Sequence, residues 1–224
     1  MSKLIRFQKE LEKIKKIILS LGTMVEDRVR KAGKLIESRD AFDAGRLIKS
    51  DYEIDEMEVE VEEECLKIIA LHQPVAVDLR FLIAVIKINN DLERIADEAV
   101  NIAQRIEIIT KNKSFEFVFD YSVMVEKVED MLKKSLDALV YFDTDIAFKV
   151  CLLDDEVDKI HRDAYDRIKQ AMEKRPEHIR YLLNLFLISR HLERIGDHAT
   201  NIAEEVIYMT EGEIVRHGKY LNEK

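Results

Sequence analysis

A sequence motif of 13 residues occurs twice in the chain, and this repeat constrains the fold more than any other feature. The stretch 91–103 recurs as 191–203, with nine of 13 positions identical at an offset of 100. Two shorter words upstream recur at an offset of 103: 51–55 matches 154–158, and 40–44 matches 143–147. Because the words recur in the same order, we predict two copies of one structural unit.

Each copy is predicted to consist of three helices, because the chain is poor in residues that break helices. Only six Gly and two Pro occur among 224 residues, of which 47% are hydrophobic. Asp40 and Asp143 are expected to cap helix starts, and Pro74 and Pro176 to begin the third helix of each copy. The fold class is therefore all-α, with two tandem three-helix bundles and six long helices near 3–38, 41–71, 75–111, 116–141, 144–174 and 177–209.

The expected domains are a first repeat at 1–112, a second repeat at 113–210 and a flexible tail at 211–224, with the joint near 112–114. Acidic residues outnumber basic ones by 45 to 36, which argues against nucleic-acid binding. Cys65 and Cys151 are expected to be reduced core residues of a cytoplasmic protein. No signal peptide or long apolar run is visible, so we expect contact with a membrane only through partners.

The third helix of each half presents two opposite faces at helical spacing. One face is apolar and is predicted to be core: Ile88, Leu92, Ile95, Ala99, Ile102 and Ile106 in the first half, and Ile188, Leu192, Ile195, Ala199 and Ile202 in the second. The other face carries carboxylates and an amide. The second helix of each half carries an acidic pair that can face them.

Carboxylates gathered in this way repel one another unless cations are bound. An all-oxygen set suits Mg²⁺, Ca²⁺, Mn²⁺ or iron and not structural zinc. The candidate metal ligands are Asp51, Asp55, Glu93, Asp97 and Asn101 in the first half, and Asp154, Asp158, Glu193, Asp197 and Asn201 in the second. Asp91 is replaced by His191 in the repeat, so that position is expected to lie outside the sites.

Two alternatives stay open from the residues alone. Acidic pairs four residues apart arise about nine times by composition, so any one pair is consistent with a solvated helix face. The carboxylates could also pair with Arg94 and Arg194, which lie inside the repeated motifs, or with Arg80 and Arg180, which could approach them. What favours the metal sites is that both copies keep the same spacing.

No motif in the sequence requires catalysis. A Gly-rich phosphate loop, a nucleophile elbow and a C-x-x-C pair are all missing from the sequence. A di-iron carboxylate enzyme would need a Glu-x-x-His motif on two helices, and the chain offers one variant, Asp158 to His161. A metal-free helical scaffold is the other alternative, in which the acidic faces are solvated surface.

The paired L-E-R-I-[AG]-D-x-A-x-N-I-A words, each preceded by a D-x-x-x-D word, resemble the PhoU family over about residues 5–210. The resemblance implies two three-helix bundles with multinuclear metal clusters held by the E(D)-x-x-x-D words. It also implies a cytoplasmic regulator of phosphate uptake at the inner membrane face, which keeps the phosphate-starvation response off. Its expected partners are the ATPase subunit of the phosphate ABC transporter and a sensor histidine kinase. We also expect a homodimer.

Overall fold

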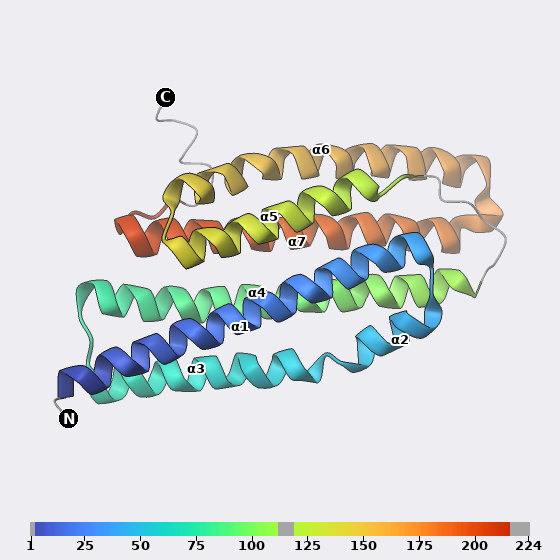
Figure 1. Ribbon diagram of the computed structural model, residues 1–224. Coiled ribbons are helices and arrows are strands. Elements are labelled where there is room, and N and C mark those ends of the chain that lie inside the picture. Colours follow the sequence, from blue (N-terminus) through green and yellow to red (C-terminus); the bar gives the residue numbers. More distant parts are fainter. Residues whose placement is uncertain (1–2, 112–118, 216–224) are drawn as a thin grey trace.

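The computed structural model describes residues 3–111 and 119–215, and these form helices joined by short turns (Figure 1). No strand occurs in these two ranges, which confirms the all-α prediction. The helices are α1 (Lys3–Ser38), α2 (Ala41–Lys49), α3 (Tyr52–His72), α4 (Ala76–Thr110), α5 (Ser122–Tyr141), α6 (Thr144–Lys174), the 3-10 turn η1 (Pro176–His178) and α7 (Ile179–Glu211).

The two halves lie side by side, with α4 and α7 in contact along the centre of the molecule (Figure 1). In the first half α1 and α3 pack on α4, and in the second half α5 and α6 pack on α7. The contact between α4 and α7 is the most extensive between any two of the described helices. The repeat therefore produces two bundles that share a central pair of helices.

The turn between the first and second helices has the same construction in both halves. Arg39 and Phe142 are at equivalent positions, and both adopt a left-handed backbone with φ of 53°. The following aspartates cap the next helix, since Asp40 accepts from the amides of Phe42 (2.8 Å) and Asp43 (3.2 Å). Asp143 accepts in the same way from the amide of Ile146 at 3.0 Å, so both predicted caps are confirmed.

The sequence predicts one long helix over 41–71 in the first half, but the structure has two helices there. The break falls at Ser50 and Asp51, between α2 and α3. There the Arg28 guanidinium donates to the Ser50 carbonyl at 2.6 Å, an acceptor that a continuous helix would use for its own backbone. The equivalent rod α6 is continuous, as predicted.

A second difference concerns the start of α5, which begins at Ser122 and not near residue 116. The Asp120 side chain accepts from the Ser122 amide at 2.9 Å and so ends the preceding turn. The predicted joint at 112–114 and most of the predicted tail lie outside the described residues, and the domain boundaries remain a prediction.

The predicted apolar faces form the core. Every residue named for those two faces is at most 2% exposed. Cys65 and Cys151 are both buried in the core, as expected. Burial of a large aliphatic side chain contributes about 1.5–3 kcal/mol, so these two stripes stabilise the packing of α4 and α7. None of the described helices has the length and apolar character needed to cross a bilayer.

Candidate functional site

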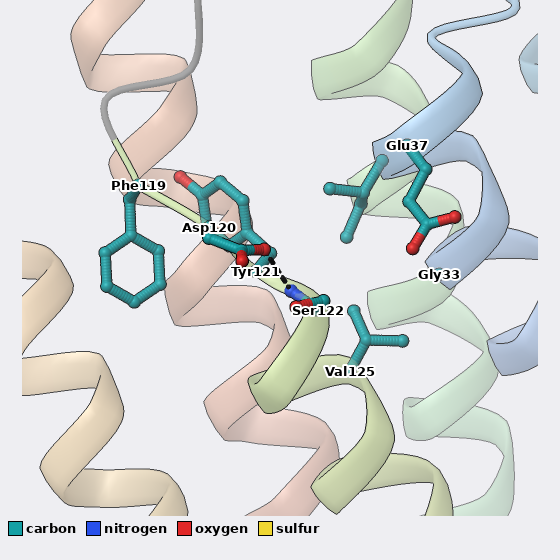
Figure 2. Close-up of a pocket in the computed structure, with 8 residues that line it drawn as sticks. Gly33, Glu37, Phe119, Asp120, Tyr121, Ser122 and Val125 are labelled. Atoms are coloured by element: carbon teal, nitrogen blue, oxygen red, sulfur yellow. Dashed lines mark hydrogen bonds between the residues drawn. The ribbon is translucent and has the colours of Figure 1, made fainter.

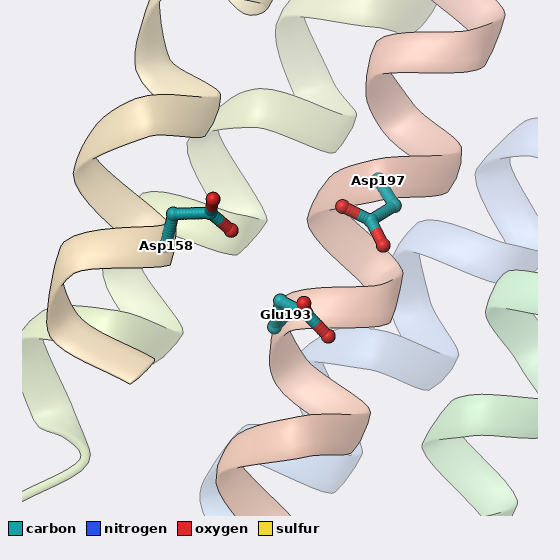
Figure 3. A group of neighbouring side chains, drawn as sticks. All are labelled: Asp158, Glu193 and Asp197. Carbon is teal, nitrogen blue, oxygen red and sulfur yellow. The ribbon is translucent and has the colours of Figure 1, made fainter. Parts of the chain in front are cut away.

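The second half gathers three carboxylates from two helices into one small space. Asp158 on α6 points toward Glu193 and Asp197, which lie one turn apart on α7 (Figure 3). One oxygen from each of the three lies within 4.8 Å of the others. Asp154 lies one turn before Asp158 on α6, and we call these four residues the second cluster.

Burial and repulsion between the carboxylates raise the pKa values within the second cluster. Burial raises the pKa of Asp154 to about 6, and the charges of Asp197 and Asp158 add to the rise. The pKa of Asp197 also rises to about 6, through burial first and then the charges of Glu193 and Asp158. Burial and the charge of Asp158 raise the pKa of Glu193 as well. The protein's own groups thus leave this negative charge poorly compensated.

The first half contains an equivalent set, Asp51, Asp55, Glu93 and Asp97, which we call the first cluster. Burial raises the pKa of Glu93, and the charges of Asp97 and Asp55 raise it further. The pKa of Asp97 is raised by burial and then by Asp51 and Asp55. These charge effects place the acidic residues of α4 and of the start of α3 near one another, but among the described residues only the second half brings three such groups within 4.8 Å of one another.

Arginine neutralises only one of these eight carboxylates among the described residues. Arg28 donates to Asp51 at 2.6 Å, and the other seven form no ion pair within the described ranges. Arg94 donates to Asn90 at 3.1 Å, and Arg194 pairs with Glu98 at 2.7 Å. Neither Arg94 nor Arg194 therefore forms an ion pair with a described cluster carboxylate, although the charge of Arg94 acts to lower the pKa of Glu93 and that of Arg194 the pKa of Glu193.

A cleft of about 970 Å³ between the halves brings parts of both copies together. Asp154 and Asp197 of the second cluster line it, and so do Glu58 and Glu62 of α3. Burial and the charges of Glu62 and Asp55 raise the pKa of Glu58. Lys87 is among the few cations of the lining. The cleft is therefore suited to cations more than to free anions.

A smaller pocket of about 270 Å³ lies where the end of α1 meets the start of α5 (Figure 2). Its lining includes Gly33, Phe119, Tyr121 and Val125, and its charged groups are Glu37 and Asp120. The Asp120 carboxylate already accepts a hydrogen bond from the Ser122 amide. This pocket holds no set of converging polar groups.

Two histidine–carboxylate pairs join the halves, and sequence reasoning missed them. His191 contacts Glu98 at 2.6 Å, and His198 contacts Asp91 at 2.8 Å. Position 91/191 was expected to lie outside the metal sites; in the structure Asp91 and His191 each contact a residue of the other repeat. The signal available in the sequence was the shared spacing of seven residues, with acids in one copy and histidines in the other.

The predicted asparagines belong to this interface as well. Asn201 donates to Asp91 at 3.1 Å, and Asn101 donates to Glu98 at 3.4 Å. Glu98 is 3% exposed. Burial acts to raise its pKa, but the hydrogen bond and charge of His191, with the charge of Arg194, outweigh burial and lower it. Asn201 therefore bonds across the contact between α4 and α7, whereas Asn101 bonds Glu98 from within α4.

Comparison with known proteins identifies the family. The family model described as the PhoU domain matches the chain twice, over residues 18–106 and 121–206. The chain belongs to the PhoU family. The double match agrees with the internal repeat and with the pairing of the two bundles.

Two relatives from bacteria are similar over almost their whole length. A PhoU homologue from Clostridium acetobutylicum is 35% identical over 210 residues, which cover 93% of this chain and 96% of the relative. One from Pseudomonas aeruginosa is 38% identical over 213 residues, covering 95% of this chain and 88% of the relative. Both are called phosphate-specific transport system accessory proteins.

Two crystal structures of PhoU-family proteins have the same fold. PhoU from Pseudomonas aeruginosa matches with a TM-score of 0.87 and 36% identity, covering 92% of this chain and 100% of the other. The phosphate transport system regulatory protein PhoU from Streptococcus pneumoniae matches with a TM-score of 0.84 and 28% identity, covering 94% of this chain and 100% of the other. The predicted fold class and family are confirmed.

Proposed function

We propose that this PhoU-family protein regulates phosphate transport and that its two carboxylate clusters bind metal ions. The regulatory part is supported by relatives that are named accessory or regulatory proteins of phosphate transport systems. Those names do not describe an enzyme, in agreement with the absence of a catalytic motif from the sequence. The metal-binding part is supported by the geometry of the clusters.

The observation that carries the metal proposal is the convergence of Asp158, Glu193 and Asp197. Their oxygens lie within 4.8 Å of one another, and none of the three forms an ion pair with a described residue. A hard cation would offset repulsion that the fold otherwise retains, and carboxylate oxygens are the ligands that Mg²⁺, Ca²⁺, Mn²⁺ or iron accept. Bound metal would tie α6 to α7, and the first cluster would tie α3 to α4.

For the wider role we propose an adaptor that acts at the cytoplasmic side of the membrane. Its partners would be the ATPase subunit of the phosphate transporter and a sensor histidine kinase, and it would work as a homodimer. Long exposed helical surfaces on both bundles support docking of other proteins. The acidic cleft supports a role in which phosphate itself is not bound directly, because like charges repel.

The test removes one carboxylate from each cluster. Asp97→Asn combined with Asp197→Asn should abolish metal retained after dialysis, measured by mass spectrometry, while circular dichroism stays unchanged. The control removes two exposed carboxylates, Glu63→Gln with Asp166→Asn, and should retain the metal. Full occupancy in the first variant would refute the metal sites and favour the metal-free scaffold. Oxygen consumption by iron-loaded protein would favour the di-iron enzyme.

A further inference from the structure

The two clusters differ in one buried residue that the repeat makes directly comparable. At the offset of 103, the word Val25-Glu-Asp matches Val128-Glu-Asp, and the next residue is Arg28 in one copy and Met131 in the other. The same offset places Leu153 where the first copy has Ser50. The first copy therefore has a polar group beside its cluster where the second has two apolar side chains.

Arg28 is held firmly in the first half. It is only 6% exposed, and it donates to the Asp51 carboxylate at 2.6 Å and to the Ser50 carbonyl at 2.6 Å. The Ser50 hydroxyl is a further acceptor at 3.2 Å. A buried guanidinium with these partners is costly to displace, because its charge would lose its compensation.

The second half has no such cation at the equivalent place. Met131 is fully buried in the core, and Leu153 packs against the same core. Arg190 and Arg194 lower the pKa of Glu193 by charge, but neither forms an ion pair with the second cluster. Asp154, which is equivalent to Asp51, accepts no ion pair from a described residue.

We propose that Arg28 is a built-in counter-cation of the first cluster, so that metal ions fill the second cluster first. This inference rests on the proposed metal binding. Four ionised carboxylates present four negative charges in each cluster, and Arg28 offsets one of them in the first. Arg28 also occupies one oxygen of Asp51, so an incoming ion meets a smaller net negative charge and one ligand oxygen that is already engaged.

The experiment measures Mn²⁺ binding at each cluster separately, by equilibrium dialysis and electron paramagnetic resonance of free Mn²⁺. Glu193→Gln with Asp197→Asn leaves only the first cluster, and Glu93→Gln with Asp97→Asn leaves only the second. We expect the second cluster to bind about tenfold more tightly or better, the size of one charge-assisted hydrogen bond.

Arg28→Met installs the residue that the chain itself uses at the equivalent position. In the protein that keeps only the first cluster, it should tighten Mn²⁺ binding about tenfold. Arg28→Lys retains the charge and should leave binding weak, which separates charge from shape. Circular dichroism confirms that each variant is folded.

Two results would overturn the inference, and they are distinguishable. Equal affinities of the two clusters, with no effect of Arg28→Met, would refute the role of Arg28 while leaving metal binding intact. No Mn²⁺ binding by the wild-type protein or by any variant would refute the proposed metal sites and this inference with them.

Discussion

Removal of the Asp197 carboxylate should stabilise the metal-free protein at neutral pH. Asp197 faces Glu193 and Asp158, and its pKa is raised from the usual 3.8 to about 6. Between these two values the folded protein binds more protons than the unfolded chain, so its stability falls as pH rises. Above about pH 6 the folded state carries the whole penalty of this charge. Asp197→Asn keeps the shape and cannot ionise.

The size of the effect follows from the same two values. The difference between 3.8 and about 6 corresponds to about 3 kcal/mol for a fully shielded group. Neighbouring protein atoms desolvate the Asp197 carboxylate, but the residue as a whole remains exposed, and solvent screening reduces the expected gain to about 1 kcal/mol. For a chain of this length that gain raises Tm by about 3 °C.

The assay is urea denaturation in chelator at pH 4, 5, 6, 7 and 8, compared between wild type and variant. The difference in the free energy of unfolding should be near zero at pH 4 and reach its full value above pH 6. Asp166→Asn, which removes an exposed carboxylate of α6, should show no such pH dependence. With saturating Mn²⁺ the order should reverse, because the wild type gains binding energy that the variant lacks. A variant less stable than wild type in chelator at pH 8 would refute the reasoning.

Three further substitutions follow, two at contacts between the halves and one as their control. Arg194→Met should reduce the free energy of unfolding by about 2 kcal/mol, because it removes a cation from the buried Glu98. Chemical denaturation at pH 7 checks this. No loss of stability would mean that His191 alone compensates the charge of Glu98. Gly33→Ala should lower the free energy of unfolding by about 1–2 kcal/mol, since the new Cβ would lie 2.6 Å from Val125. In Gly45→Ala the new Cβ meets nothing within 4 Å, so this variant should be more stable by about 0.5–1 kcal/mol. Thermal unfolding checks both glycine variants. Shifts of Tm in the same direction for the two would contradict this account.

The sequence alone determined the features that depend on local spacing. Helical periodicity identified the buried faces of α4 and α7, and the capping preference of aspartate located the turns at Asp40 and Asp143. The repeat also paired the acidic words correctly, because a copied unit brings its own second and third helices together. Each of these depends on residues within a few turns of one another, or on two copies folding alike.

Only the tertiary structure decided which distant side chains meet. The partners of Glu98 and Asp91 are histidines 93 and 107 residues away, and their pairing depends on how α4 crosses α7. The break between α2 and α3 depends on Arg28, which reaches Ser50 and Asp51 from another helix. Spacing along one helix cannot determine these contacts, because their energies arise where two rods pack and exclude water from opposite charges.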